Sequence, residues 1–579
     1  MDAIEAAADA LDAVADRVLY DGILRLFPEL ATRLGVHDHD ARLSDPGPAG
    51  RREYAAILER ARRKLDAIDA PALEAAQRTA FEIVSLWLDT EITGLPFGGT
   101  TFVLDPLHGF HLELPKLFDE MRYRGAEDYR IALARLAAVP RYVDGVIESL
   151  RADLRDGRPE ARPVVEKVLA QLDFQLALAP EEHPFFARFR AAASATTPSS
   201  PASEHIDETA AEARSLLVDH VLPAWRRARE FVATEYLPLA RDDVGIWATA
   251  GGDERYDWCV RRYTTTALSA EEIHAIGMRE VARIRREMES IRARVGFDGD
   301  LRAFFEHLRS EPRFYYDDPE DLLTGYRAIC KRADAALPNL FGRLPRHPYG
   351  VTPIPDFAAR SATSAYYNAP PADGSRPGWF YANTYRLEMR PRYEMEALAL
   401  HEAVPGHHLQ LSLQLELEGV SKLRSRVIEF TSFVEGWGLY AERLGIEMGF
   451  YTDPYSDFGR LTFEMWRACR LVVDTGMHRL RWTREQAIEF LLANSALSRL
   501  NVESEIDRYI TWPGQALAYK IGELEIRRLR ALSESELAER FDVRAFHDVV
   551  LAAGSLPLAM LDARVRAWVA ARQRDDAAR

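Results

Sequence analysis

The stretch MEALALHEAVPGHHLQLSLQLELEG, residues 395–419, is an apolar run with helical spacing that contains His401, Glu402, His407 and His408. In zinc peptidases the pattern H-E-x-x-H places two imidazoles one helical turn apart on one face, with the intervening Glu beside the metal. The present segment matches that pattern only if Pro-Gly in H-E-A-V-P-G-H is an insertion of two residues. This stretch therefore predicts a metal site on an interrupted helix.

The Pro-Gly pair supplies the interruption. On an unbroken helix His407 would lie six residues, or roughly 240°, around from His401, and the two could not share an ion. Pro405 removes an amide and disfavours helical angles at Val404, while Gly406 accepts the backbone angles that a break requires. We therefore expect a distorted helix that brings the two imidazoles together.

His408 is the competing ligand. It would return to the face of His401 if the helix stayed regular, with a rise of about 10 Å between them. We prefer His407 as ligand and assign His408 a supporting role. A helix break whose histidines only bond to backbone or acidic neighbours is the alternative without a metal.

A zinc site of this type needs a third protein ligand and an open position for water. In EFTSFVEGWGLYAERLG, residues 429–445, Glu435 and Glu442 lie two turns apart on nearly the same side of a helix. The glycines and aromatic residues around Glu435 suit close packing in a dry site. We expect Glu435 to be the third ligand and Glu442 to orient a ligand imidazole. A solvated acidic helix face would give the same spacing.

The predicted chemistry is hydrolysis assisted by one Zn²⁺ per chain. The ion polarises a carbonyl and acidifies a water molecule, while Glu402 takes the proton and passes it to the leaving amine. Two imidazoles and a carboxylate also suit manganese, cobalt or iron.

Charge developing on the carbonyl oxygen requires a hydrogen-bond donor, and the candidates are Tyr519 and His478. Gln515 lies four residues before Tyr519, so both can face the substrate, whereas the adjacent Lys520 lies on another face. Arg470 and Asp474 precede His478 at four-residue intervals, so Asp474 could orient its neighbours. An ordinary ladder of helix ion pairs would have the same spacing.

Two further substrate contacts are candidates. The run WFYANTY, residues 379–385, could offer backbone groups to an extended substrate, with Asn383 as a side-chain contact, or it could be a packed aromatic edge. Arg376, in a loop rich in glycine and proline, could bind a substrate carboxylate through its planar fork.

Composition excludes several classes of function. A net charge of −16 argues against nucleic acid as a partner, because phosphate backbones attract clustered Lys and Arg. The three cysteines are far apart and do not suggest disulfides. The first residues lack the basic and apolar segments of a signal peptide, and no apolar run of about 18 residues predicts a membrane span. We therefore expect a folded cytoplasmic protein, either monomer or homodimer.

Most of the chain shows helical periodicity. Capping boxes predict three helix starts, at Ser269 with Glu272, Thr483 with Gln486, and Ser533 with Glu536. A stretch rich in Ser, Thr and Pro at residues 193–208 suggests a boundary between an N-terminal helical lobe, 1–195, and a catalytic region, 205–579. Pro345 to Thr384 is irregular and includes a short candidate strand. The fold class expected is mainly α, with a small β element.

The sequence resembles the prokaryotic domain of unknown function 885 family. The resemblance rests on H-E-x-x-P-G-H at His401 to His407, E-G-W at Glu435 to Trp437, and the segments YYNAPPADGSRPGWFYANTY, RLVVDTGMH and ESEIDRYITWPGQALAYKIG. The resemblance implies that His407 and Glu435 are ligands. It also implies a large two-lobed helical body with a deep cleft, similar to thimet oligopeptidase and the thermophilic zinc carboxypeptidases.

The function expected is therefore a zinc-dependent hydrolase of peptide or amide bonds, of carboxypeptidase or oligopeptidase type. Its partner is a peptide or small amide substrate. An amidase that acts on a small non-peptide metabolite would use the same site. A helical binding protein that keeps a metal only for structure is the third hypothesis, but such a protein has no need of Glu402.

Overall fold

The computed structural model describes residues 3–98, 104–195, 201–360 and 362–577. The chain is mainly helical with one small sheet, as the sequence predicts. It divides into two compact units. Unit 1 comprises residues 1–244, 248–251 and 371–373, and unit 2 comprises 245–247, 252–370 and 374–579. All residues of the predicted site belong to unit 2.

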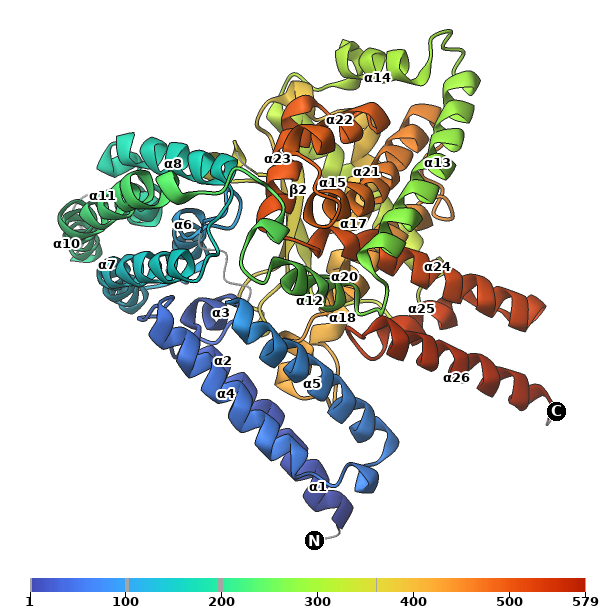
Figure 1. Cartoon of the computed structure of the whole chain (residues 1–579), viewed down its shortest axis with the longest axis horizontal. Coiled ribbons are helices and arrows are strands. Elements are labelled where there is room, and N and C mark those ends of the chain that lie inside the picture. The colour runs from blue at the N-terminus through green and yellow to red at the C-terminus, as the bar shows by residue number, and fades with distance from the viewer. Residues whose placement is uncertain (1–2, 99–103, 196–200, 361, 578–579) are drawn as a thin grey trace. The chain divides into compact units, whose positions relative to one another are not determined.

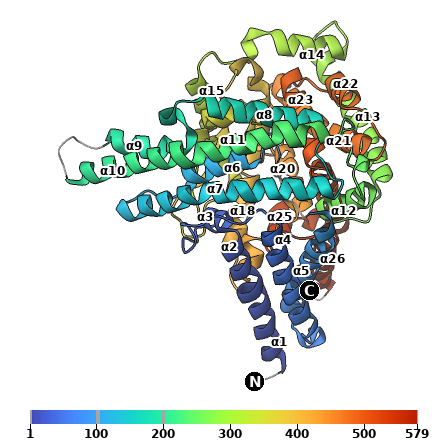
Figure 2. The same cartoon turned by 60° about the vertical axis from the view of Figure 1, so that its left-hand side comes forward.

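Unit 1 is built from helices alone in the described residues. They are α1 Ala3–Asp12, α2 Asp21–Leu26, α3 Pro28–Arg33, α4 Pro48–Asp66, α5 Ala75–Gly94, α6 Phe110–Glu120, α7 Ala126–Arg155, α8 Arg162–Ala177, α9 Ala187–Ala195, α10 Pro201–Leu216 and α11 Leu222–Phe231. Helices α7, α8 and α11 lie side by side in both views (Figures 1 and 2).

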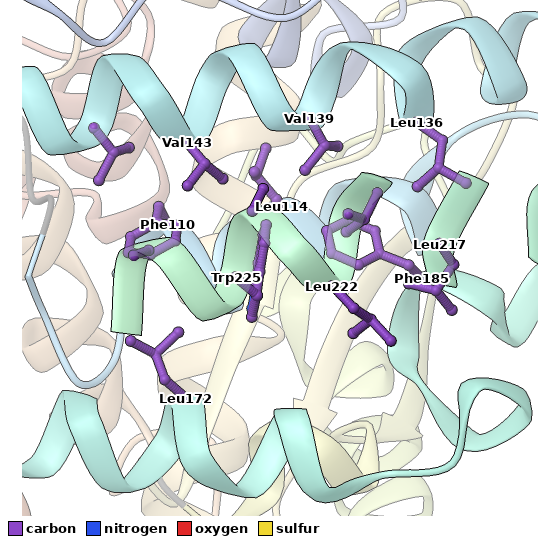
Figure 3. Packing of buried hydrophobic residues seen from close by; sticks show 14 of the residues in the cluster. Phe110, Leu114, Leu136, Val139, Val143, Leu172, Phe185, Leu217, Leu222 and Trp225 are labelled. Carbon is purple, nitrogen blue, oxygen red and sulfur yellow. The ribbon is translucent and has the colours of Figure 1, made fainter. Parts of the chain in front are cut away.

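The core of unit 1 lies between these helices. Trp225 of α11 is buried between Val139 and Val143 of α7 on one side and Leu172 of α8 on the other (Figure 3). The indole N–H donates to Gln175 Oε1 at 2.9 Å, so its one polar atom is satisfied inside the core. Burial of these large apolar side chains is the main force that holds the helices together.

Unit 2 contains the remaining helices. They are α12 Gly252–Thr264, α13 Ala270–Arg294, α14 Leu301–Ser310, α15 Pro319–Ala336, α16 Asp356–Ala359, α17 Met395–Glu402, α18 His407–Leu415, α19 Lys422–Arg426, α20 Thr431–Leu444, α21 Pro454–His478, α22 Arg484–Asn494, α23 Arg499–Thr511, α24 Ala518–Leu537, α25 Val543–Leu551 and α26 Leu558–Ala577. Helix α13 packs along α21, and α20 packs along α24 (Figure 1).

Glycines set the distance between α20 and α24. A Cβ atom at Gly436 would lie 2.5 Å from the backbone carbon of Gly522, so the two backbones touch at this point. This contact confirms the close approach expected from the glycines around Glu435. It also places Glu435 of α20 and Tyr519 of α24 on neighbouring helices of one packed pair.

The small β element is a three-stranded sheet with strand order β1-β3-β2. It consists of β1 Tyr349–Pro353, β2 Ala365–Asn368 and β3 Gly378–Ala382. Strand β3 pairs in parallel with β1 and antiparallel with β2. The run Trp379–Tyr385 thus begins in the central strand, whose backbone groups already pair on both sides. This strand cannot accept an added substrate strand, so the prediction that its backbone groups bind an extended substrate is wrong.

Two of the three predicted helix starts are confirmed. Ser269 caps α13 and Thr483 caps α22, each with the reciprocal bond of a capping box. The third prediction is wrong, because Ser533 lies inside α24, where its hydroxyl donates to Leu529 O at 2.8 Å. A serine within a long helix can satisfy its hydroxyl on the preceding turn, so the local pattern alone was misleading.

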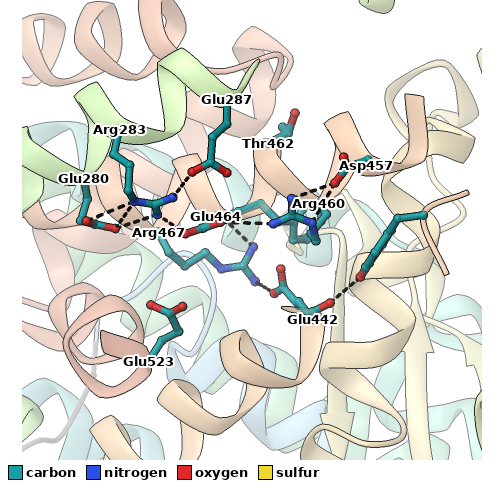
Figure 4. Close-up of polar contacts among 12 residues, drawn as sticks. Glu280, Arg283, Glu287, Glu442, Asp457, Arg460, Thr462, Glu464, Arg467 and Glu523 are labelled. Carbon is teal, nitrogen blue, oxygen red and sulfur yellow. Dashed lines mark hydrogen bonds and ion pairs between the residues drawn. The ribbon is translucent and has the colours of Figure 1, made fainter. Parts of the chain in front are cut away.

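A buried ion network joins α13, α21 and α24. Figure 4 shows the part of it around Arg283, Glu464 and Arg460. Lys520 Nζ lies 2.8 Å from Glu464, 2.9 Å from Glu523 and 3.2 Å from Glu280. Glu464 also pairs with Arg283 and Arg460. The network holds α21 and α24, which carry several of the predicted site residues, in one fixed relation.

The division into compact units falls near residues 244–252, whereas the sequence suggested a boundary between residues 195 and 205. Helix α10 begins at Pro201 and belongs to unit 1, and residues 196–200 lie outside the described residues. Among the helices described, none combines the length and apolar character needed to cross a membrane.

Candidate metal centre

The predicted helix break is present. Helix α17 ends at Glu402 and α18 begins at His407, with Val404–Pro405 as a cis peptide between them. A Cβ atom at Gly406 would lie 1.9 Å from His401 O, so only glycine fits this turn. Trp437 Nε1 donates to Pro405 O at 2.8 Å and fixes the break against α20.

The break brings His401 and His407 together with Glu435. His401 Nε2 lies 3.4 Å and His407 Nε2 lies 3.3 Å from Glu435 Oε2. One ligand atom from each residue lies within 4.8 Å of the others. Zinc bonds of about 2.0–2.1 Å place the ligand atoms of a tetrahedral site about 3.3–3.4 Å apart. The two measured distances match this spacing.

A buried carboxylate oxygen without a hydrogen-bond partner at this centre also fits a bound cation. Glu435 Oε2 is buried and has no hydrogen-bond partner among the described residues. His407 and His401 outweigh the effect of burial and hold the pKa of the Glu435 carboxyl well below its usual range. Burial opposes protonation of His401, but its contacts with Glu435 and Glu442 raise the pKa of its imidazole to about 10. The three side chains therefore favour a positive charge between them.

Two of the three side chains at this centre are partly exposed. The side chains of Glu435 and His407 are 18% and 10% exposed, whereas that of His401 is 3% exposed. A catalytic zinc site has three protein ligands and an open position for water, and partial exposure of two side chains is compatible with such a position.

Glu442 supports His401 from behind. Its Oε1 lies 2.8 Å from His401 Nδ1, which directs Nε2 toward Glu435. Arg467 Nη2 lies 3.4 Å from the same carboxylate oxygen (Figure 4). A Cβ atom at Gly438 would lie 2.7 Å from His401 Cε1, so α20 approaches the ring closely. The placement of Glu442 agrees with its predicted role as the carboxylate that orients a ligand imidazole.

Glu402 is the remaining carboxylate at the end of α17. It is buried, and no hydrogen bond joins its side chain to another described residue. Burial raises the pKa of the Glu402 carboxyl, while His401 and His407 oppose the rise. A carboxylate that is easier to protonate than usual is suited to accept and return a proton.

His408 is not available as a ligand. Its Nδ1 accepts from the Tyr367 hydroxyl at 2.7 Å, and its Nε2 donates to His347 O at 3.0 Å. Burial lowers the pKa of this imidazole to about 4, so it is neutral. His408 links β2 to α18 and makes no hydrogen bond to His401, His407 or Glu435, so the choice of His407 over His408 as the candidate ligand agrees with the geometry.

Tyr519 stands beside His401. Their rings stack at 6.4 Å between centroids, with 22° between the ring planes. The Tyr519 oxygen accepts from Arg508 Nη2 at 3.1 Å and from Gln515 Nε2 at 3.4 Å. Because these two donors occupy the lone pairs of the oxygen, the hydroxyl proton is available for another acceptor. Gln515 is thus placed with Tyr519, as predicted.

Arg470 also lies beside Tyr519, but it is not oriented by Asp474 as predicted. Its guanidinium lies 4.2 Å from the centroid of the Tyr519 ring, and its Nε and Nη2 donate to Tyr509 and Glu505. It makes no ion pair with Asp474. The predicted stripe of Arg470, Asp474 and His478 is therefore not a connected network.

His478 and Asp474 have structural partners. Ile246 N donates to His478 Nδ1 at 3.0 Å, and His478 Nε2 lies 2.8 Å from Tyr509 O. Both ring nitrogens are engaged with the backbone, so the prediction of His478 as an oxyanion donor is wrong. Asp474 accepts from the Tyr256 hydroxyl at 2.6 Å and from Gly514 N, and orients neither Arg470 nor His478.

Three other predicted substrate contacts lie elsewhere in unit 2. Asn383 is buried in the turn after β3, and its amide group bonds to backbone groups of Ala359, Thr363 and Tyr385. Lys520 is enclosed by the ion network. Both predictions are corrected, because these polar atoms are already paired. Arg376 is partly exposed in the loop before β3, and its assignment stays a prediction.

Two arginines at the site were not predicted from the sequence. Arg467 contacts Glu442, and Arg508 contacts Tyr519. Arg508 lies in the quoted segment ESEIDRYITWPGQALAYKIG, seven residues before Gln515, but a break in helical periodicity at Trp512 to Gly514 separates them. Arg467 lies three residues before Arg470 on α21, so the two neighbours on one helix face were the available signal.

Comparisons with known proteins agree with this fold. A crystal structure described as "the putative lipoprotein from Colwellia psychrerythraea" matches with a TM-score of 0.90 at 28% identity, covering 98% of this chain and 99% of that one. A "putative lipoprotein of unknown function from Shewanella oneidensis" matches with a TM-score of 0.68 at 19% identity, covering 95% and 98%, and shows the fold alone.

No curated protein matched the sequence. The family model described as bacterial protein of unknown function, domain of unknown function 885, matches residues 28–565. This match spans most of both compact units and includes every residue of the candidate centre. The chain is a member of the domain of unknown function 885 family.

Proposed function

We propose that the chain is a zinc-dependent hydrolase of peptide or amide bonds. The observation that carries the proposal is the spacing of His401, His407 and Glu435, whose ligand atoms surround a point suited to a small cation. Zinc held there would polarise the scissile carbonyl and acidify a water molecule. Manganese, cobalt or iron would also suit these ligands.

The residues around this centre supply the other steps of hydrolysis. Glu402 takes a proton from the attacking water and returns it to the leaving amine. Tyr519 donates its hydroxyl proton to the carbonyl oxygen as negative charge develops there. Glu442 and Arg467 hold His401 in one orientation. A role as a metal-containing binding protein is less well supported, because Glu402 would then be a buried carboxylate without a purpose.

The proposed likeness to thimet oligopeptidase and the zinc carboxypeptidases rests on the same residues, since these enzymes combine a helical body with a His-Glu-His zinc site. We also propose that the protein acts on small substrates in the cytoplasm and binds neither nucleic acid nor membrane. The net negative charge of the chain supports the exclusion of nucleic acid.

Metal analysis of the purified protein and a peptide-library digest read by mass spectrometry test the proposal. We expect about one zinc per chain and cleavage products. Glu402→Gln should keep the zinc and lose about 10²-fold to 10⁴-fold in turnover. The matched control is Glu418→Gln, an exposed residue beyond α18.

Unchanged turnover in Glu402→Gln would refute its role as the base. A zinc-containing protein that leaves the whole library intact would point to the amidase of a small metabolite. A protein that binds no divalent metal would refute the proposed function.

A further inference from the structure

Three arginines surround Tyr519, which stacks on His401. The guanidinium carbons of Arg470 and Arg467 lie 4.2 and 5.8 Å from the Tyr519 ring centroid, and Arg508 Nη2 donates to its hydroxyl. All three arginines are buried, with residue exposures of 2%, 3% and 9% for Arg470, Arg467 and Arg508 respectively. Such a concentration of cations in the interior requires compensating negative charge.

The compensation within the chain is incomplete. Glu505 serves both Arg470, at 3.0 Å, and Arg508, at 3.7 Å. Glu442 serves Arg467 but is shared with His401. Within ion-pair distance, three guanidiniums therefore share two carboxylates, one of which also contacts His401. Glu394 and Glu402 interact with Arg467 only at longer range.

Hydrogen-bond donors are also left over. Arg467 Nε, Arg470 Nη1 and Arg508 Nε are buried and have no partner among the described residues. Unbonded donors in the interior are costly, and several of them around one side chain are unusual for a purely structural cluster. An anion that binds beside Tyr519 would supply negative charge and hydrogen-bond acceptors to these arginines.

Arg508 is the member of the cluster best placed to contact such an anion. Its side chain is 11% exposed, whereas those of Arg470 and Arg467 are 2% and 4% exposed. The planar guanidinium fork matches the two oxygens of a carboxylate. Arg508 touches the same hydroxyl that faces the scissile carbonyl in the proposed mechanism. A substrate carboxylate bound to Arg508 would therefore belong to the residue next to the scissile bond.

We infer that Arg508, backed by Arg470 and Arg467, binds the free carboxylate of the substrate. The substrate class is then peptides or N-acyl amino acids with a free C-terminal carboxylate, from which one residue is released. Water adds its hydroxyl to the acyl carbon, the C–N bond breaks, and the leaving amine receives a proton from Glu402. This inference rests on the proposed function.

Binding to catalytically silent protein tests the inference separately from turnover. Zinc-loaded Glu402→Gln is titrated calorimetrically with N-benzoyl-glycyl-phenylalanine and with its C-terminal amide. We expect the free acid to bind at least about tenfold more tightly than the amide. Adding Arg508→Ala should remove this preference, whereas Arg508→Lys should retain part of it. Arg499→Ala, on the same helix but exposed at the surface, is the matched control and should leave the preference unchanged.

Zinc content measured in every variant separates the possible failures. Protein that holds zinc but binds acid and amide equally overturns the inference and leaves the proposed function standing. The inference is likewise overturned if Arg508→Ala keeps the preference for the acid. Protein without zinc overturns the proposed function and this inference together. If Arg508→Ala does not fold, the acid-to-amide ratio in the Glu402→Gln protein and the Arg508→Lys variant decide the question.

Discussion

Glu442 Oε1 lies 2.8 Å from His401 Nδ1, which leaves Nε2 of the same ring directed at Glu435. A histidine held in this way has one tautomer and one orientation, so its second nitrogen is ready to bind a metal. Glu442 lies on α20 with Glu435, and the same helix therefore provides one of the three candidate ligands and the carboxylate that supports another.

Glu442→Gln should weaken zinc binding by about tenfold to a hundredfold, because the amide loses the charge that orients and polarises His401. Competition with a metallochromic chelator measures the affinity. Glu447→Gln, an exposed carboxylate paired with Arg530 just beyond the same helix, is the control and should bind zinc normally. Equal zinc affinity in Glu442→Gln and the wild type would count against the support of His401 by Glu442.

Gly438→Ala should displace the ring of His401, since the new Cβ would lie 2.7 Å from Cε1. The packed interior leaves the ring little room to move, and we expect about a tenfold or greater loss of zinc affinity. Gly125→Ala is a suitable control, because no atom lies within 4 Å of its added Cβ. Circular dichroism checks that both variants remain helical. A Gly438→Ala protein with normal zinc affinity would show that His401 is not confined as described.

Tyr519→Phe should lower kcat by about 10²-fold to 10³-fold, which corresponds to one lost oxyanion donor. Zinc content and KM should change little, because the ring still packs on His401. Steady-state kinetics on a substrate from the library digest measure the effect. Tyr54→Phe, which removes a hydroxyl bonded to Glu91 in unit 1, provides the comparison. A loss confined to KM would assign Tyr519 to substrate binding instead.

Lys520→Met should destabilise the fold by about 3–5 kcal/mol, because it leaves Glu464, Glu523 and Glu280 buried together without their shared cation. Urea denaturation followed by circular dichroism measures the change. Lys331→Met removes a lysine whose side chain is 85% exposed, and its effect should stay below about 1 kcal/mol. Similar small effects in both variants would show that the network contributes little to stability.

Asp474 should make stability depend on pH. Burial raises the pKa of its carboxyl to about 7, although Tyr256 and Gly514 N–H favour the ionised form. The folded protein therefore holds more protons than the unfolded chain between about pH 4 and pH 7, and the free energy of unfolding falls as pH rises through this range.

Asp474→Asn should remove the contribution of this carboxyl to the fall, while the raised pKa of Glu394 keeps a remaining slope. Relative to the wild type, the variant should gain up to about 4 kcal/mol between pH 4 and pH 8. Denaturant titrations at several pH values measure the slope. Asp562→Asn is the comparison, since Arg566 and Arg528 outweigh burial and lower the pKa of that carboxyl, so its removal should not alter the slope above about pH 5. A parallel slope in Asp474→Asn and the wild type would contradict the assignment.

Local patterns in the sequence predicted the parts of the centre that depend on spacing along the chain. Pro405 and Gly406 between two histidines indicated a helix break, and the structure has one between α17 and α18. The seven-residue interval from Glu435 to Glu442 put both carboxylates on one side of α20. The capping boxes at Ser269 and Thr483 also marked true helix starts, whereas the same pattern at Ser533 lies inside α24, so a cap pattern alone does not locate a helix start.

Partners that come from distant segments could not be predicted in the same way. His478 and Asn383 have the chemistry of site residues, but backbone groups of other segments already occupy their polar atoms. Lys520 follows Tyr519 directly, yet the 100° turn per residue of a helix directs it into the ion network instead. Arg508 reaches Tyr519 because the turn at Gly514 brings the end of α23 back beside the start of α24.

The sequence by itself determined the helical character of the chain, the interruption after Glu402 and the residue types able to bind a cation. These properties depend on backbone propensities and on spacing within a few turns of helix. Only the tertiary structure decided which histidine meets Glu435, which polar groups are already paired, and that three arginines gather at one tyrosine. Such choices depend on the packing of helices far apart in the chain, which no local pattern encodes.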